Sequence, residues 1–289
     1  MAIIKTEHLE YIYSQNTPFE KTAVCDVNIE IEQNDFVGII GHTGSGKSTL
    51  VQHLNGLLRP TSGKLYVDGE DVWEQPKQIR QLRFKVGLVF QYPEYQLFDE
   101  TVEKDIGFGP RNMGLSEEEV RQRVYDAARQ VRLSESLWKK PPFDLSGGEK
   151  RRAAIAGVLA MQPKVLVLDE PTAGLDPLGR DTILDEIAQY RAEHQTTVLL
   201  VSHSMEDVAK VADKVLVMNK GKVAMYDTVD RVYSRGEELE QIGLNVPAVT
   251  KIFMGLRRNN LPVGAGVFSM DQAQRELVAL FEQRGRLKK

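Results

Sequence analysis

A glycine-rich stretch near the start of the chain reads Gly41-His42-Thr43-Gly44-Ser45-Gly46-Lys47-Ser48-Thr49 and matches the phosphate-loop pattern G-x-x-x-x-G-K-[ST]. In such a loop the glycines let consecutive backbone N–H groups curl around phosphate oxygens, and Lys47 meets the β and γ phosphates. Ser48 would place its hydroxyl on Mg²⁺, and the following helix adds its positive N-terminal end. The chain lacks a third glycine at the spacing of a dinucleotide fingerprint, which argues against a Rossmann-type site. The stretch therefore predicts a site for a nucleoside triphosphate.

Short apolar runs surround this loop and alternate with helix-like segments. Residues 36–40 form such a run directly before the loop, and a helical run over 47–55 follows it. Three further runs are typical of strands buried on both faces of a sheet: 86–90, 165–168 and 197–201. Residues 117–133 carry apolar side chains at helical spacing, with Ser116 and Glu119 as a capping box. This alternation predicts an α/β fold with a parallel sheet and crossover helices.

Both ends of the chain depart from that alternation. The first third contains β-like stretches, which lie at 3–4, 24–31 and 64–67. Near the other end, residues 215–218 and 223–225 are expected to form a closing hairpin. A short helix near 228–234 and a last helix over about 271–283 should follow. We place a domain boundary near Gly243, so that residues 1–243 form the main domain and 244–289 a C-terminal appendage.

The composition excludes several classes of protein. The 289 residues are 42% hydrophobic and 27% charged, which is the balance of a globular chain. The net charge of −4 provides no overall cationic field for nucleic acid. The single cysteine, Cys25, can form neither an internal disulfide nor a cysteine-built metal site, and it suits a reducing compartment. Because the chain has no run of 18 apolar residues and no apolar stretch at its start, we expect neither a membrane-spanning nor a secreted protein.

Two acidic residues, Asp169 and Glu170, follow the apolar run 165–168. An acid at the carboxyl end of a buried parallel strand lies at the crevice where such sheets bind ligands. Asp169 there suits Mg²⁺, held mostly through water because this ion dehydrates reluctantly. Glu170 is placed to polarise an attacking water. The alternative is that the two acids cap the next element, but beside a phosphate loop we favour a magnesium and hydrolysis site.

A second motif separates this chain from most nucleotide hydrolases. It reads Leu145-Ser146-Gly147-Gly148-Glu149, and here the chain resembles the ATP-binding cassette (ABC) family, whose signature has this form. The serine hydroxyl and the glycine N–H groups stand at the start of a helix and make a second anion site. Taken alone, such a turn is more often only a turn. Its place between the phosphate loop and Glu170 supports the resemblance.

The resemblance covers about residues 1–243 and implies roles for four further residues. Gln91, after the run 86–90, resembles the Q-loop glutamine that reaches the Mg²⁺ and the attacking water. Asp176 lies in a segment that resembles the D-loop, which crosses the dimer seam. His203 resembles the switch histidine that contacts the γ-phosphate. Tyr13 aligns best with the aromatic residue that stacks on adenine, and Tyr11 is its rival.

The resemblance also implies the fold and the assembly. It implies a P-loop nucleoside triphosphatase of the RecA-like type, with a parallel-sheet core and an antiparallel β subdomain. A helical signature subdomain would span about residues 92–160. In this family each nucleotide lies between the phosphate loop of one subunit and the signature of the other. This chain has one phosphate loop, so its signature residues would serve a partner's nucleotide, namely Ser146, Gly147, Gly148 and Glu149.

The residues around Gln91 narrow the choice within the family. Repair and chromosome-structure ATPases insert a long coiled coil before the signature, and translation-factor cassettes carry two cassettes per chain; this chain has neither feature. Residues 90–98 and 101–112, and the tail around 261–263, resemble the ATPases of energy-coupling factor transporters, and their second-ATPase branch most. Four residues are candidate walls of a groove for an amphipathic coupling helix: Tyr92, Tyr95, Leu97 and Phe98.

This resemblance implies an ATPase that drives the uptake of vitamins or transition-metal ions in bacteria, with ATP and Mg²⁺ bound. The expected partners are a second related ATPase, in a heterodimer or a homodimer, a transmembrane coupling subunit and a substrate-binding membrane subunit. No nucleic acid is expected. The implied location is peripheral, on the cytoplasmic face of the cell membrane. The alternative is a soluble regulatory ABC ATPase that acts by nucleotide-dependent dimerisation without transport.

Overall fold

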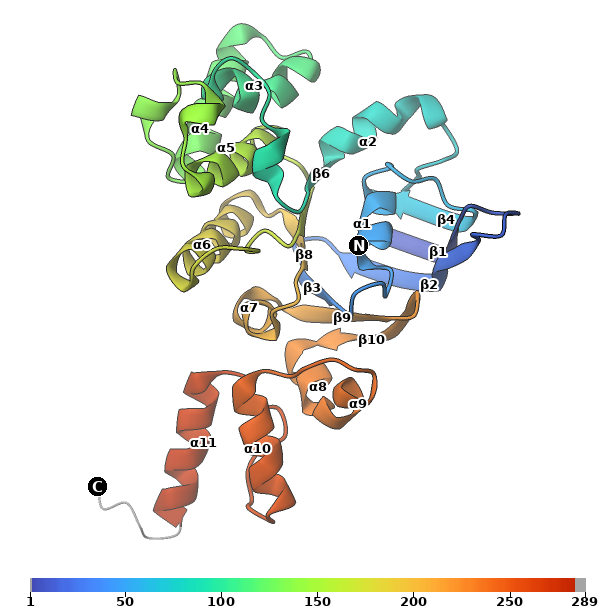
Figure 1. The fold of residues 1–289 in the computed structure, drawn as a ribbon, viewed down its shortest axis with the longest axis vertical. Coiled ribbons are helices and arrows are strands. Elements are labelled where there is room, and N and C mark those ends of the chain that lie inside the picture. Colours follow the sequence, from blue (N-terminus) through green and yellow to red (C-terminus); the bar gives the residue numbers. More distant parts are fainter. Residues whose placement is uncertain (1, 284–289) are drawn as a thin grey trace.

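The computed structural model describes residues 2–283, and a six-stranded sheet lies at its centre (Figure 1). The strands follow the order β10-β9-β3-β8-β7-β6, with these bounds: β3 (Phe36–Ile40), β6 (Val86–Val89), β7 (Val165–Asp169), β8 (Thr197–Val201), β9 (Lys214–Asn219) and β10 (Lys222–Thr228). Strands β9, β3, β8, β7 and β6 are paired in parallel, and β10 pairs antiparallel with β9. The predicted parallel sheet is confirmed.

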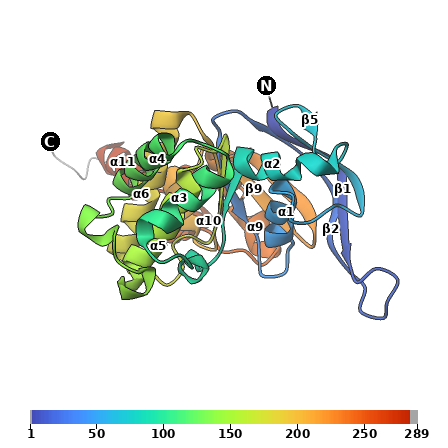
Figure 2. The ribbon, with the colours of Figure 1, turned by 90° about the horizontal axis from the view of Figure 1, so that it is seen from above.

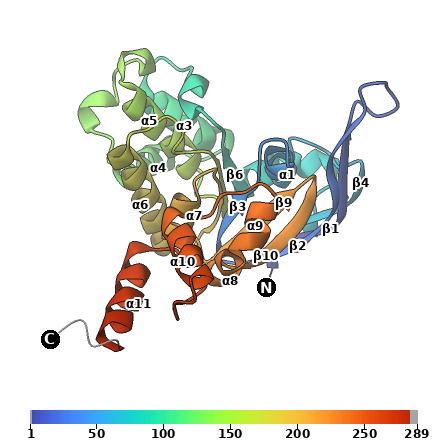
Figure 3. The ribbon, with the colours of Figure 1, turned by 60° about the horizontal axis from the view of Figure 1, so that its bottom comes forward.

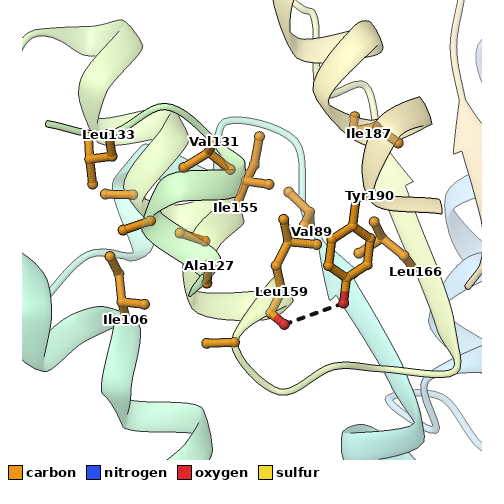
Figure 4. Close-up of a cluster of buried hydrophobic side chains, with 14 of the residues drawn as sticks. Val89, Ile106, Ala127, Val131, Leu133, Ile155, Leu159, Leu166, Ile187 and Tyr190 are labelled. Carbon is orange, nitrogen blue, oxygen red and sulfur yellow. Dashed lines mark hydrogen bonds between the residues drawn. The ribbon is translucent and has the colours of Figure 1, made fainter. Parts of the chain in front are cut away.

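Each central strand contributes to two hydrophobic cores, because successive side chains of a strand point to opposite faces. In β7, Leu166 and Leu168 belong to one core, while Val165 and Val167 belong to the other. The first core lies against helices α5 (Gly147–Leu159) and α6 (Pro177–His194). There the Tyr190 hydroxyl donates to the Leu159 carbonyl over 3.4 Å (Figure 4). Burial on both faces explains why these strands read as continuous apolar runs.

A second, antiparallel sheet has the order β2-β1-β4-β5 and the bounds β1 (Ala2–Tyr13), β2 (Lys21–Glu32), β4 (Ser62–Val67) and β5 (Glu70–Asp71). The second core fills the space between the two sheets and includes helix α1 (Lys47–Leu54). Strand β1 is much longer than the expected 3–4. Its register with β2 shifts on both sides of Leu9, and His8 has a left-handed φ of 49°. These irregularities break the alternation that would reveal the strand.

The helices that lie between β6 and β7 in the sequence form a separate group. These are α3 (Val102–Asn112), α4 (Glu117–Gln130) and α5, and Figures 1 and 3 show them together at one end of the molecule, away from the antiparallel sheet. Helix α2 (Ile79–Lys85) precedes β6. Ser116 and Glu119 form the expected capping box, in which the Ser116 N–H donates to Glu119 Oε2 over 2.8 Å. Helix α4 ends before the expected residue 133, because Arg132 takes a left-handed φ of 49°.

Helix α7 (Met205–Val211) lies beside the central sheet, and the later helices lie at the opposite end of the molecule (Figures 1 and 3): α8 (Val229–Ser234), α9 (Gly236–Gln241), α10 (Ala248–Arg258) and α11 (Met270–Gln283). One buried cluster contains both Leu239 and Leu244, so hydrophobic packing continues across Gly243. Helices α9 and α10 were not predicted, because glycine and proline residues in and next to them weaken the helical pattern. Residues 284–289 of the proposed appendage lie outside the described residues. Within residues 2–283, no helix has the length and apolar character needed to cross a membrane.

Figure 2 shows the chain from above and displays the link between strands β1 and β2 as a loop that extends away from the body of the molecule. Phe19 in this loop is 84% exposed. Several other boundaries differ from the sequence expectations by one residue; α1, for example, ends at Leu54 and β6 at Val89. Such differences are within the ordinary uncertainty of element ends.

Gly38, in the buried strand β3, lets helix α7 pack directly on the central sheet. A Cβ at this position would overlap Val208 Cγ1, and Val208 is itself fully buried. We expect Gly38→Ala to lower the free energy of unfolding by about 1–3 kcal/mol, because overpacking pushes α7 outward. Urea unfolding followed by circular dichroism measures this loss. The double variant Gly38→Ala/Val208→Ala should regain part of it, and an unchanged single variant would contradict the close packing.

Candidate nucleotide-binding and hydrolysis site

The phosphate loop connects β3 to α1 through a backbone path that requires glycine. Gly46 has a φ of 101°, and a Cβ there would overlap the Ala23 carbonyl oxygen of β2. Gly44 has a φ of 79°, and nothing lies within 4 Å of the position its Cβ would take. An L-residue with a side chain is strained in this left-handed region. One glycine therefore permits the close approach to β2, and the other leaves open space inside the curl of the loop.

Neighbouring strands hold the loop in place. The Ser45 carbonyl accepts from the Gly221 N–H over 2.9 Å, and the Gly221 carbonyl accepts from the Cys25 N–H over 2.8 Å. His42 Nε2 lies 3.1 Å from Asn219 Oδ1 at the end of β9, and His42 Nδ1 lies 2.8 Å from the Thr43 carbonyl oxygen. His42 is thus tied to the protein on both ring nitrogens.

Lys47 is buried and turns back over the loop. Its ammonium group donates to the Gly41 carbonyl over 2.6 Å and to the His42 carbonyl over 3.2 Å. Burial lowers the pKa of Lys47, and the charges of Glu170 and Asp169 partly offset this effect. The Ser45 hydroxyl is also buried, and it finds no hydrogen-bond partner within residues 2–283. A buried cation with a third donor and an unsatisfied hydroxyl suit an anionic ligand such as the phosphates of a nucleotide.

Ser48 and Asp169 come together at the start of α1 and the end of β7. The Ser48 hydroxyl lies close enough to the Asp169 carboxylate to favour its charged form. Burial raises the pKa of Asp169, while Ser48 and Lys47 act in the opposite direction. Among residues 2–283, no three or more histidine, cysteine or acidic side chains gather as metal ligands. One carboxylate and one hydroxyl match Mg²⁺, which keeps several waters and takes its other ligands from phosphate.

Glu170 follows directly in a strained conformation with a φ of 53°. Its N–H donates to the Val201 carbonyl over 3.0 Å, and its Oε1 lies 3.4 Å from Nε2 of His203. Burial, with a contribution from the charge of Asp169, raises the pKa of Glu170 to about 7. Burial lowers the pKa of His203, Lys47 adds to this effect and Asp169 opposes it, so the site favours the neutral imidazole. Glu170 Oε1 is buried and accepts no hydrogen bond within the described part of the chain.

Gln91 is the one proposed Mg²⁺ residue that the structure does not bring into contact with the others. It follows β6, which pairs in parallel with β7, so it lies at the same edge of the sheet as Asp169. Its side chain is exposed and makes no hydrogen bond to Ser48 or Asp169. The Q-loop role that the resemblance implies for Gln91 therefore stays a prediction.

Tyr13 ends β1 beside the phosphate loop. Its hydroxyl lies 3.2 Å from Thr49 Oγ1 on α1, and its side chain is 39% exposed. Tyr11 packs edge-on against Tyr13 at 4.8 Å and against buried His53 at 4.9 Å between ring centroids. Of the two candidate tyrosines, Tyr13 therefore has the more exposed ring, and the Tyr11 ring packs between Tyr13 and His53.

The signature residues form the open N-terminus of α5. Ser146 caps the helix, and Glu149 Oε2 accepts from the Ser146 N–H over 2.8 Å in a second capping box. Nothing lies within 4 Å of the position that a Cβ on Gly147 would take, and Ser146 and Gly147 are exposed. Figures 1 and 3 place α5 in the group with α3 and α4, apart from α1 and the phosphate loop. The two anion sites of this chain are therefore separate.

Asp176 begins α6. Its side chain accepts from the Gly179 N–H over 2.6 Å and caps the helix. Asp176 itself is exposed, and so is Leu178. The last residue of the segment that resembles the D-loop and the start of α6 are thus exposed to solvent in the single chain.

Arg151 is a residue that the sequence analysis missed. It is 3% exposed on α5, and its guanidinium donates to both carboxylate oxygens of Glu94, over 2.8 and 3.1 Å. It also donates to the Ala173 carbonyl over 2.6 Å and the Pro171 carbonyl over 3.3 Å. Arg151 thus joins the signature helix to the segments that follow β6 and β7. Its spacing of four residues from buried Ile155 is the one sequence signal that it faces inward.

Comparison with protein families and curated relatives gives consistent matches. The family model described as ABC transporter matches residues 24–173. A protein from Clostridium acetobutylicum, called energy-coupling factor transporter ATP-binding protein EcfA2, is 55% identical over 280 residues, which cover 96% of this chain and 98% of that protein. A protein of the same name from Caldanaerobacter subterraneus is 52% identical over 275 residues, which cover 95% of this chain and 96% of that protein.

Solved structures with the same fold include two that bear on the site. The structure of cbiO1 from Clostridium perfringens, described as part of the ABC transporter complex cbiONQ, matches with a TM-score of 0.74 and 39% identity. The match covers 88% of this chain and 99% of that one. A dimeric ATP-binding cassette in a post-hydrolysis state, bound to ADP and phosphate, matches with a TM-score of 0.69 and 26% identity, over 78% of this chain and 98% of that one.

The Gly46 conformation makes a direct prediction about nucleotide binding. Gly46→Ala should weaken ATP affinity by about 10-fold or more, because its Cβ overlaps the Ala23 carbonyl and displaces the loop from the N-terminus of α1. Isothermal titration with ATP measures the change. Gly114→Ala is the matched control, since Gly114 has a similar φ of 83° in open space outside the site. Equal affinities for the wild type and Gly46→Ala would contradict the prediction.

Proposed function

Because the chain belongs to the ABC transporter family, and within it to the ATP-binding proteins of energy-coupling factor transporters, we propose that it hydrolyses ATP to drive import through partner membrane subunits. The proposed cargo is a vitamin or a transition-metal ion. The observation that carries this proposal is the buried Glu170 carboxylate. Its Oε1 has no hydrogen-bond partner and lies 3.4 Å from Nε2 of His203. Asp169, which is near Ser48, and Lys47 both act on its pKa. That arrangement suits hydrolysis of a phosphoanhydride.

Each residue of the cluster has a proposed task in hydrolysis. Lys47 and the N–H groups of the loop would hold the β and γ phosphates, while Ser48 and Asp169, with Gln91, would hold Mg²⁺. Bound Mg²⁺ would neutralise charge on the phosphate oxygens. Glu170 Oε1 accepts a hydrogen bond from the attacking water, and a pKa near 7 suits a general base. Neutral His203 directs an N–H toward the γ-phosphate.

The remaining site residues are proposed to contact the adenine base or a partner subunit. The exposed Tyr13 ring stacks on adenine, with Thr49 and Tyr11 holding it in place. The open N-terminus of α5, with Ser146, Gly147, Gly148 and Glu149, completes the nucleotide site of a second related ATPase, and the Asp176 segment contacts that partner. Hydrolysis is then mainly a matter of positioning and charge stabilisation by groups from two subunits.

The proposed domains follow from these tasks. Residues 1–243 form the ATP-binding domain, with a helical subdomain at about 92–160, and 244–289 form a contact region for another subunit. A coupling subunit in the membrane is proposed to dock beside Gln91, where three aromatic side chains are exposed: Tyr92, Tyr95 and Phe98. Leu97, the fourth residue considered, packs instead against the helical core. An amphipathic helix of that subunit would cover this surface on the cytoplasmic face of a bacterial membrane.

Glu170→Gln tests the catalytic assignment. The variant keeps the size of the side chain and removes the base, so kcat should fall by about 100-fold or more while ATP binding stays within about 3-fold. Steady-state phosphate release and ATP titration measure the two quantities. Glu186→Gln is the matched control, because Glu186 is equally buried on α6 and has no role in the proposed site. Unimpaired hydrolysis by Glu170→Gln would refute the assignment.

Purification from membranes tests the transport proposal. The tagged chain, extracted in mild detergent, should bring down a second ATPase and two membrane proteins, which mass spectrometry can identify. Tyr95→Asp should reduce recovery of the membrane proteins by about 10-fold, because Tyr95 is 85% exposed on the proposed docking surface. Phe19→Asp is the matched control, an equally exposed aromatic residue in the β1–β2 loop. Recovery without any membrane protein would favour the regulatory ATPase instead.

A further inference from the structure

A buried aspartate joins the segments that carry Glu170 and His203. Asp207 lies in the first turn of α7 and is 7% exposed. Its Oδ2 accepts from the Thr172 hydroxyl over 2.9 Å, and its Oδ1 accepts from Nη2 of Arg180 over 2.6 Å. Thr172 is buried two residues after Glu170, and Arg180 lies in the first part of α6, which Asp176 caps. One carboxylate therefore holds two segments that both follow β7.

The serines on each side of His203 belong to the same network. Ser204 Oγ accepts from the Asp207 N–H over 3.1 Å, which caps α7, and from Nη2 of Arg180 over 2.9 Å. The Ser204 N–H donates to Ser202 Oγ over 3.0 Å. The backbone on both sides of His203 is thus held by hydrogen bonds that lead to Asp207 and Arg180.

These contacts form a closed ring. The chain runs from Glu170 to Thr172, a hydrogen bond crosses to Asp207, and the first turn of α7 leads back to His203. His203 Nε2 then lies 3.4 Å from Glu170 Oε1, a proximity without a hydrogen bond, which brings the path back to its start. Because the Asp207 link is buried and charge-assisted, it is stronger than an ordinary surface contact. The network therefore holds the backbone segments from which the Glu170 and His203 side chains extend.

We propose that Asp207 is a positioning residue that sets the relative placement of Glu170 and His203, and that Arg180 extends this placement to the first turn of α6. The inference rests on the proposed ATP hydrolysis at this site. Asp207 acts through Thr172 and Ser204 and makes no hydrogen bond to Glu170 or His203. Its charge also adds to the raised pKa of Glu170, and Thr172→Val separates the two effects because it keeps that charge. A displacement of about 1 Å in catalytic groups can cost about 100-fold in rate, so loss of the ring should affect turnover more than binding.

The test uses ATPase kinetics of the full chain in the assembly purified from membranes. Activity is counted as the part that Glu170→Gln abolishes. Asp207→Ala should lower kcat by about 10- to 100-fold while KM for ATP stays within about 3-fold, because the phosphate loop is untouched. Thr172→Val should lower kcat by a smaller factor. The double variant should lose no more than Asp207→Ala alone, since both changes open the same ring.

Asp181→Asn provides the matched control. Asp181 follows Arg180 on α6 and pairs with Lys210 of α7 over 3.0 Å, so it links the same two helices away from the ring. This variant should keep a kcat within about 2-fold of the wild type, since exposed ion pairs contribute little. Should Asp207→Ala fail to fold, Asp207→Asn, which keeps the size of the side chain, and Thr172→Val carry the kinetic test.

The possible outcomes separate the two proposals. A wild-type assembly no more active than its Glu170→Gln form overturns the proposed hydrolysis. An active wild type whose folded Asp207 and Thr172 variants keep normal kcat values overturns the positioning role. The same follows if those variants lose no more kcat than Asp181→Asn, or change only KM for ATP. A selective loss of kcat in the ring variants supports the role.

Discussion

The parallel pairing of β3, β8 and β7 is the constraint on which the rest of the site depends. Ile39 pairs with Val201, and Val201 pairs with Asp169, so that the three strands end in one row. The Ser202 N–H donates to the Ile39 carbonyl over 3.3 Å, and the Glu170 N–H donates to the Val201 carbonyl over 3.0 Å. The phosphate loop, Glu170 and His203 therefore leave the sheet at one edge. Segments that lie far apart in the chain meet there because the backbone ladder aligns them.

Burying charge at this edge costs stability and supports function. Lys47, Asp169 and Glu170 are each less than 10% exposed. Burial lowers the pKa of Lys47 and raises the pKa of Glu170 to about 7. Both shifts disfavour the charged form of the side chain. The apolar cores on both faces of the sheet hold these groups in place. A nucleotide with its metal ion would supply the missing complement of charge.

Several features of the fold could be read from the sequence because their local pattern was strong. The central strands are continuous apolar runs, and α4 begins with a capping box that involves only Ser116 and Glu119. Strand β1 was largely invisible, because bulges near Leu9 interrupt its alternation. Helix α10 was not predicted, because Pro247 directly precedes it and Gly255 lies inside it. The packing that crosses Gly243 joins residues through side-chain contacts, which no local pattern reports.

The sequence by itself determined which motifs make up the candidate site, since the phosphate loop, the Asp169–Glu170 pair and the signature are short motifs whose residues are neighbours in the chain. Only the tertiary structure decided how these motifs meet. The signature helix lies apart from the phosphate loop, and Gln91 makes no hydrogen bond to Asp169. Tyr13, and not Tyr11, has the exposed ring. Buried Arg151 and Asp207 both bind the segment that follows β7, through the Ala173 carbonyl and the Thr172 hydroxyl. The physical reason is that motif spacing reflects local backbone geometry, whereas these contacts depend on which strands pair and which helix faces are buried.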